Sequence, residues 1–275
     1  MRRHLQGIDH VVVLVRDLDK AQHAYARMGF TLTPRGFHTL GSQNHCLMFG
    51  NDYVELLAVP RPHPAMQYFT DFLAKGEGLG AIALATDDAG GLHASLAADG
   101  IAADAPLDFS RPVEGLSDAR FRIVQLPPDL SPGCRMFACQ HFTRDVVWRT
   151  EYQRHPNGAT EIAAVAVVAE DPEAAAASYG KLLAARPQEI EEGLLMRTGS
   201  APIAIASRWK LGHRLHGVGL PLRPRPLVAA LFVRVANRAQ TAAVLRRNGL
   251  DPVALADGAF AVSAQDAHGI AVVFG

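Results

Sequence analysis

The chain has 275 residues, of which 49% are hydrophobic and 20% are charged, and this is the composition of a globular protein rather than a disordered one. Lysine and arginine together number 27, as do aspartate and glutamate, so the formal net charge is zero. Because no excess charge would attract nucleic acid or an anionic membrane, we expect neither as a partner.

Cysteine usage and hydropathy favour a cytoplasmic protein. Cys46, Cys134 and Cys139 form no CxxC motif, and an odd number without framework spacing is typical of a reducing compartment. The apolar run 11–15 ends at Arg16, which makes it too short for a secretory signal. No run approaches the roughly 20 apolar residues that span a bilayer.

The first predicted elements form a β-strand, a helix and three further strands. The apolar run 8–15 predicts a strand, and Asp17 is a good N-cap for a helix over 18–28. The apolar residues of this helix fall on one face, and Gly29 is suited to end it. Short β-like runs then follow at about 30–37, 45–50 and 52–59.

The same order of elements recurs three more times along the chain. Strand-like runs at 80–87, 163–170 and 229–236 each lead to Asp or Asn and a helical stretch. We therefore predict four βαβββ units, which begin near residues 7, 78, 160 and 227.

Pairs of units should fold together. A sheet with one helix leaves a face uncovered, so two units pair to bury it. The Pro- and Gly-bearing stretch 152–159 separates the first pair from the second. The predicted domains are residues 1–155 and 156–275.

Several segments stand in a specific order and spacing: GIDHVVVLVRDLDKAQHAYARMGF, NDYVELLAV, GLGAIALATDD and FACQHFTRDVVW followed by HPNGA. Their order and spacing resemble those of the vicinal-oxygen-chelate superfamily of glyoxalases, bleomycin-resistance proteins and extradiol dioxygenases. The resemblance spans nearly the whole chain, is sharpest over 7–159, and is closest to glyoxalase-like proteins. It implies an α+β fold in which the four units pair into two half-open eight-stranded barrels. It also implies that any metal is bound by the first and fourth strands of each unit.

The resemblance places one metal site in the N-terminal half. Seven residues before the helix cap stands His10 in the first unit, whereas the other three units have alanine, which is Ala81 in the second unit. Glu55 interrupts an apolar fourth strand, where a buried carboxylate costs several kcal/mol unless it is paired or binds a cation. His141 stands near the position of a closing glutamate. The predicted ligands are therefore His10, Glu55 and His141.

Two imidazoles and one carboxylate suit divalent Fe, Mn, Zn or Ni. The alanine at position 81 argues against a four-ligand glyoxalase I site. Other interpretations remain open: His10 as a hydrogen-bonded core histidine, Glu55 paired with arginine or backbone, and a one-residue shift that turns Gln140 inward instead of His141.

Asn44, His45 and Gln140 are predicted to contact substrate. Asn44 and His45 resemble polar residues that line the cup in glyoxalase-like proteins, although the segment 42–46 is also typical of a turn. The corresponding strands of the second half carry no strong ligand, so that half is expected to be structural.

The first functional hypothesis is a metal-dependent lyase, isomerase or dioxygenase that acts on a small oxygen-chelating substrate, with Glu55 as both ligand and proton acceptor. The second is a metal-free protein that binds or sequesters a small molecule. A third is a scaffold whose dimer surface is functional, and a homodimer is possible. The sequence has no GxGxxG, P-loop or GxSxG motif, so it gives no support for dinucleotide-binding, nucleoside-triphosphate-binding or serine-hydrolase classes.

Overall fold

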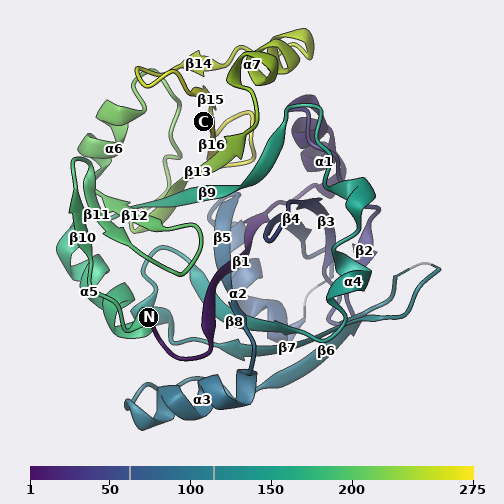
Figure 1. Ribbon diagram of the computed structural model, residues 1–275, viewed down its shortest axis with the longest axis vertical. Helices are drawn as coiled ribbons and strands as arrows, with labels where there is room; N and C mark the ends of the chain where they lie inside the picture. Colours follow the sequence, from purple (N-terminus) through teal and green to yellow (C-terminus); the bar gives the residue numbers. More distant parts are fainter. Residues whose placement is uncertain (62, 114) are drawn as a thin grey trace.

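The computed structural model describes residues 1–61, 63–113 and 115–275, and it contains two mixed eight-stranded sheets (Figure 1). Each sheet is built from two consecutive βαβββ units, which confirms the predicted α+β architecture. In Figure 1 the C-terminal half, green to yellow, occupies the upper left, and the N-terminal half lies below and to the right. No helix of the described ranges is both long enough and apolar enough to cross a bilayer.

The first sheet has the order β2-β3-β4-β1-β5-β8-β7-β6. Its strands are β1 (Leu5–Leu14), β2 (Gly36–Phe37), β3 (Gln43–Met48), β4 (Tyr53–Ala58), β5 (Gly78–Thr86), β6 (Leu107–Arg111), β7 (Ala119–Gln125) and β8 (Arg135–His141). The helices of this half are α1 (Leu18–Arg27), α2 (Gln67–Ala74), α3 (Ala89–Ala98) and α4 (Arg144–Val147), with short 3-10 helices at Pro64–Met66, Pro128–Leu130 and Thr150–Tyr152.

The second sheet repeats this order as β10-β11-β12-β9-β13-β16-β15-β14. Its strands are β9 (Ala159–Val168), β10 (Gln188–Ile190), β11 (Gly193–Met196), β12 (Ile203–Ala206), β13 (Leu227–Val235), β14 (Val253–Ala254), β15 (Phe260–Val262) and β16 (Ala271–Phe274). The helices are α5 (Pro172–Leu183), α6 (Arg208–Arg214) and α7 (Arg238–Arg247).

The repeat depends on the same helix cap in every unit. Asp17, Asp88, Asp171 and Asn237 each accept a hydrogen bond from the backbone N–H three residues later, at 2.9 to 3.0 Å. Such a side chain satisfies one of the free N–H groups of the first turn, so it fixes where the helix begins. Because each cap follows a first strand at the same spacing, the four units can be aligned by their caps.

One apolar core joins the two sheets. The larger apolar residues on one face of each sheet pack with helices α1, α3, α5 and α7 into a continuous cluster. Tyr25 of α1 is fully buried in this core, and its hydroxyl donates to the carbonyl of Ala267 in the other half at 3.2 Å. The domain boundary predicted after residue 155 falls between the sheets and stays a prediction, because the core does not divide there.

The first sheet curls until its edges approach each other. The Thr39 hydroxyl after β2 donates to the Ser110 carbonyl of β6 at 3.4 Å, and the rings of His38 and Phe109 meet edge to face with centroids 6.2 Å apart. The sheet thus forms a half-open barrel, and its inner face encloses a hollow.

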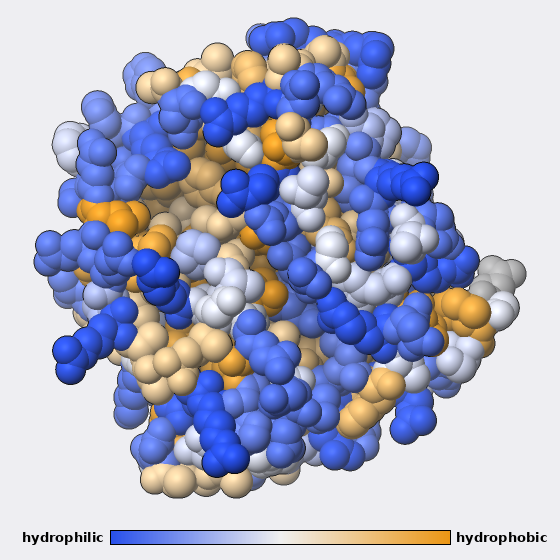
Figure 2. All heavy atoms as spheres, viewed as in Figure 1, coloured by the Kyte–Doolittle hydropathy of each residue, from blue (hydrophilic) through white to orange (hydrophobic). Residues whose placement is uncertain are grey.

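The inner face of the second sheet is largely covered by helix α6 instead. Leu211 of α6 and Leu215 after it are buried against small residues of the strands. Most of those residues are alanines, including Ala166, Ala230 and Ala271. Figure 2 shows weakly hydrophobic residues recessed between hydrophilic ones over this half. The prediction that the second half is structural therefore has a physical basis, since a helix occupies the space that is hollow in the first half.

The contact of Gly269 with the first half should tolerate no side chain. A Cβ at Gly269 would lie 2.2 Å from the Glu77 carbonyl oxygen, whereas at Gly258 the nearest atom, on Arg238, would be 3.5 Å away. The two glycines have nearly equal φ values, +82° and +79°, so alanine carries the same backbone cost at both. We predict that Gly269→Ala lowers the free energy of unfolding by about 1–3 kcal/mol more than Gly258→Ala, as measured by urea denaturation. Equal losses would show that the close contact does not exist in solution.

Asp52 should make stability depend on pH. Its buried carboxylate accepts a hydrogen bond from the Ile162 N–H of β9 at 3.0 Å, and burial raises its pKa from 3.8 to about 7. The folded state therefore favours the protonated form, and this group's contribution to stability is lost as pH rises from about 4 through about 7. Asparagine keeps the acceptor oxygen without the charge. The stability of Asp52→Asn relative to the natural chain should rise by roughly 1–3 kcal/mol between pH 5 and pH 8 in urea unfolding. A pH-independent difference would contradict this role.

Candidate functional site

The inner face of the first sheet surrounds a hollow of about 810 Å³, counted with the part that opens to solvent. Most of its wall is apolar or aromatic, and the polar side chains lie on strands β1, β3, β4, β6 and β7 and in the loop after β2. The polar residues in the wall are His10, His38, Ser42, Asn44, Glu55, Arg111 and Gln125. A mainly apolar cavity with a few convergent polar groups is the usual form of a small-molecule site.

His10 and Glu55 meet in this hollow. Strands β1 and β4 are parallel neighbours with Val12 opposite Glu55, so alternation along β1 places His10 on the same face as Glu55. His10 Nε2 lies 3.8 Å from Glu55 Oε2, and the two side chains are 5% and 8% exposed. The sequence predicted both side chains on the inner face, and the structure brings them together.

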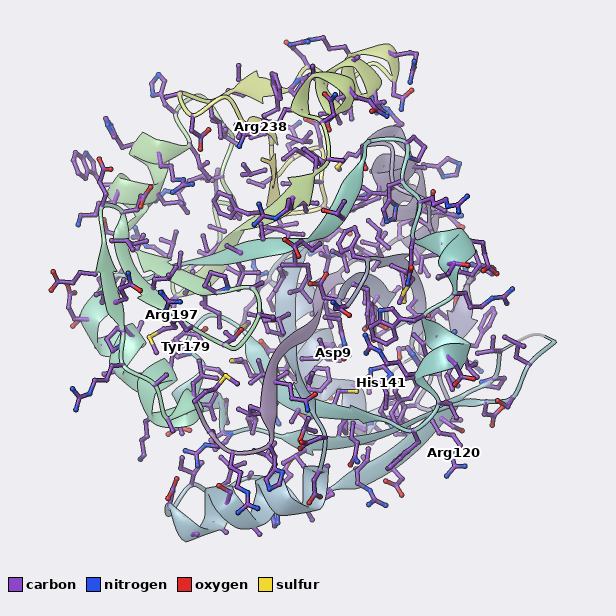
Figure 3. All side chains as sticks on the ribbon, viewed as in Figure 1. Asp9, Arg120, His141, Tyr179, Arg197 and Arg238 are labelled. Atoms are coloured by element: carbon purple, nitrogen blue, oxygen red, sulfur yellow. The ribbon has the colours of Figure 1, made fainter. Side chains whose placement is uncertain are left out.

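Asp9 holds His10 from the other side. Its Oδ1 lies 2.6 Å from His10 Nδ1 and 3.1 Å from His141 Nε2, and Figure 3 shows Asp9 and His141 beside each other. Burial alone would raise the pKa of Asp9, but the hydrogen bonds with His10 and His141 outweigh it and hold the pKa well below its ordinary value. Asp9 is therefore a buried, ionised carboxylate between two imidazoles.

The contact between Asp9 and His10 could not be predicted from the alternation of side chains along the strand. Successive side chains of a regular strand point to opposite faces, which would turn Asp9 away from His10. The pairing of β1 with β5 shifts register between Ile8 and His10, and such an irregularity lets adjacent side chains share a side. The available signal was a charged residue inside a strand that is buried from Gly7 to Leu14.

Asn44 and His38 both lie near Glu55 Oε1, the carboxylate oxygen that is not directed at His10. Asn44 Nδ2 donates to Glu55 Oε1 at 2.6 Å, which leaves Oε2 toward His10. His38 Nε2 lies 3.9 Å from Oε1, and its Nδ1 lies 2.8 Å from the Ser42 hydroxyl. Burial lowers the pKa of His38, so its imidazole is neutral near pH 7. His38 follows a two-residue edge strand, and no periodicity in the sequence pointed to it.

The structure does not bring three of the predicted residues into the hollow. His45 lies between Asn44 and Cys46, which face the hollow, so it points away and its Nδ1 contacts the Thr33 carbonyl at 2.8 Å. The Gln140 side chain accepts a hydrogen bond from the Ala89 N–H at the start of α3 and donates one to the Asp87 carbonyl. His141 contacts Asp9 instead of Glu55.

The strand pairing also locates the other two positions at which the resemblance implies metal ligands. Glu55 pairs with Val12, two residues after His10, and in the second unit Ala83, two residues after Ala81, pairs with Phe137. Phe137, and not His141, is thus the counterpart of Glu55. Of the four positions implied by the resemblance, His10 and Glu55 carry ligand-capable groups, while Ala81 and Phe137 do not.

A second set of possible ligands lies next to His10. One oxygen of Asp9, the Cys139 sulfur and one His141 nitrogen lie within 4.8 Å of one another. Burial raises the pKa of Cys139 well above its ordinary value, so the thiol is neutral, and a thiol is a poor ligand until it loses its proton. The Nδ1 atom of His141 is buried and has no hydrogen-bond partner among the described residues.

The chemistry of His10 and Glu55 fits a divalent cation better. A ligand distance of about 2.0–2.2 Å lets one ion span two donors that are 3.8 Å apart. A metal-bound histidine usually gives its other nitrogen to a carboxylate, and Asp9 holds His10 Nδ1 in this way. His38 adds a neutral imidazole next to the same carboxylate.

Three solved structures share this fold at low sequence identity. A hypothetical protein from Staphylococcus aureus has a TM-score of 0.70 at 13% identity, with 98% of each chain covered. A Mn(II)-bound glyoxalase from Novosphingobium aromaticivorans has a TM-score of 0.61 at 14% identity, covering 98% of this chain and 82% of its own. A mutant of 4-hydroxymandelate synthase from Streptomyces coelicolor has a TM-score of 0.60 at 14% identity, covering 92% and 77%.

The sequence matches none of the curated proteins with which it was compared. The model of the glyoxalase-like domain family matches residues 8–183, which is more than half of the chain. The match contains every polar residue of the hollow. Together with the fold, it shows that the chain belongs to the glyoxalase-like domain family of the vicinal-oxygen-chelate superfamily.

Proposed function

We propose that the chain is a metal-dependent enzyme of the isomerase or lyase type, which moves a proton on a small oxygen-bearing substrate in the hollow of the first sheet. The observation that carries the proposal is the buried pair of His10 Nε2 and Glu55 Oε2, 3.8 Å apart, with His10 Nδ1 held by Asp9. His10 and Glu55 would hold a divalent cation, which would supply Lewis acidity for an oxygen of the substrate.

Asp9 sets the orientation of His10. With its Nδ1 held by the ionised Asp9 carboxylate, His10 presents Nε2 as a lone-pair donor toward the hollow. Asp9 does not line the hollow, so it acts as a positioning residue. His141, on the other side of Asp9, helps to fix the carboxylate.

Glu55 and His38 are the groups that can carry a proton. Asn44 fixes the Glu55 carboxylate, and the neutral His38 imidazole lies 3.9 Å from its Oε1. A carboxylate that meets the substrate, backed by a neutral imidazole, can accept a proton at one carbon and return it at another. This pairing favours isomerisation or lysis over dioxygen insertion, and the apolar walls keep water away from the transferred proton.

One observation favours a second function, which is metal-free binding of an apolar molecule. Two of the four family ligand positions hold Ala81 and Phe137, and the wall of the hollow is mostly apolar. In that case Glu55 would serve as a hydrogen-bond acceptor for the ligand. Metal analysis separates the two functions.

A stoichiometric ion should depend on His10 and Glu55. We predict that protein purified without a histidine tag binds one Mn²⁺ or Zn²⁺ per chain, and that chelation lowers its melting temperature because an ion bound to the folded state stabilises it by mass action. His10→Ala and Glu55→Gln should abolish binding in calorimetry. Two variants should still bind the ion: Cys139→Ser, and His23→Ala, which replaces an exposed histidine of α1. Absence of an ion in the natural protein would refute the enzyme proposal, and loss only in Cys139→Ser would place the ion at Asp9, Cys139 and His141.

Neutralising Asp9 should weaken the site without emptying it. Asp9→Asn keeps a side chain of the same size but removes the charge that orients His10 and stabilises its binding form. We predict a loss of about 10- to 100-fold in metal affinity, as is usual for such supporting carboxylates, measured by competition with a chromophoric chelator. Asp108→Asn, in an exposed pair with Arg122, is the control and should leave the affinity unchanged. An unaltered affinity in Asp9→Asn would mean that His10 needs no such partner.

A further inference from the structure

Arg111 contributes a positive charge to the wall of the hollow. It is the last residue of β6, and it pairs with Ala119, whose side chain packs on the inner side of the sheet. Arg111 lines the hollow, and it also lines an outer groove formed by the segments 33–35 and 146–152. It therefore lies where the inner space meets the surface.

The absence of a side chain at Gly36 makes room for Arg111. A Cβ on Gly36 would lie 2.9 Å from Arg111 Cδ, 3.0 Å from Arg111 Nη1 and 2.3 Å from Asn44 Oδ1. The backbone of Gly36 has no positive φ, so the need for glycine comes from space alone. Arg111 and Asn44 thus lie against the same point of the wall, and Asn44 donates to Glu55. This packing connects the guanidinium with the proposed reaction centre.

The charge of Arg111 acts on the interior of the hollow. Burial is the main cause that lowers the pKa of His38, and the positive charge of Arg111 acts in the same direction. Burial and Glu55 raise the pKa of Cys46 to about 12, while Arg111 opposes the shift. No carboxylate among the described residues forms an ion pair with Arg111. Glu55 lies more than an ion-pair distance from it.

The outer groove leads toward Arg111 with charge of the same sign. Arg35 and Arg149 line it together with Arg111, and the described lining contains no acidic residue. Arg35 pairs with Asp19, and Arg149 pairs with Glu151, so both are partly neutralised. Arg111 is therefore the arginine best placed to bind an anion that enters the hollow.

We infer that Arg111 binds the carboxylate of a small acid whose apolar, aromatic-sized body lies against the walls around Phe69, Phe121 and Phe137. These rings line the same hollow as Arg111, and its guanidinium fork matches the two oxygens of a carboxylate. One guanidinium balances one negative charge, while Glu55 would repel a second, so a monoanion fits better than a phosphate dianion. The inference rests on the proposed function in taking the hollow as the substrate site.

The test compares an acid with its neutral amide. Metal-stripped protein is titrated by calorimetry with 3-phenylpropionate, 3-phenylpropionamide and phenyl phosphate. The natural protein should bind the acid about tenfold or more tighter than the amide, because a charge-assisted hydrogen bond to arginine is stronger than one between neutral groups. Arg111→Gln should lose this preference and still bind the amide within twofold. Arg111→Lys should show a smaller preference than arginine.

The matched control is Arg120→Gln. Arg120 lies on β7 and pairs with Ser110 of β6, which is the neighbour of Arg111 in the chain. The Arg120 side chain is exposed on the outer face (Figure 3). This variant should bind all three probes as the natural protein does. The inference fails if the natural protein shows no preference for the acid, if Arg111→Gln keeps the preference, or if phenyl phosphate binds more tightly than the acid. Because Arg111→Gln should retain the divalent ion, and the titrations need no metal, failure of the metal proposal is distinguishable from failure of this one.

Discussion

The site depends on a buried ionised carboxylate that bridges two imidazoles. Asp9 contacts both His10 and His141, and these contacts offset the desolvation that would otherwise favour its neutral form. An unpaired charge at 1% exposure would cost several kcal/mol, so the two histidines and Asp9 must be understood together. The result is a hydrogen-bonded support behind His10, whose other ring nitrogen lies 3.8 Å from Glu55 in the wall of a mainly apolar hollow. In the proposed function, binding and catalysis both begin from this preorganised pair.

The two halves show how one repeated unit can have different uses. Both sheets have the same strand order, and both contribute one face to the shared core. In the second half Leu211 and alanine-bearing strands close the inner face, whereas in the first half aromatic walls leave it open. The candidate site is thus confined to one of two similar sheets, and the other sheet packs against this half through the core and through contacts such as the one between Gly269 and Glu77.

The fold could be predicted because its signals are local and repeated four times. Each first helix of a unit begins at a capping residue that the sequence shows, namely Asp17, Asp88, Asp171 or Asn237. The alternation of side chains along the first strand correctly placed His10 on the inner face. The rest of the site depends on geometry that the sequence does not express. The register shift next to Asp9 breaks the alternation, the pairing of β5 with β8 decides that Phe137 replaces a ligand, and curling of the sheet brings His38 and Arg111 to one seam. His45 and Gln140 do not line the hollow, because a shift of one residue along a strand turns a side chain to the opposite face of the sheet.

The most direct test of the central claim is a crystal structure of the Mn²⁺-soaked protein with anomalous diffraction data. We expect one strong anomalous peak inside the first sheet, about 2.0–2.3 Å from His10 Nε2 and from a Glu55 oxygen, with Asp9 bonded to His10 Nδ1. A peak coordinated by Cys139 and His141, or no peak in the hollow at saturating Mn²⁺, would contradict the assignment of His10 and Glu55 as the metal-binding pair.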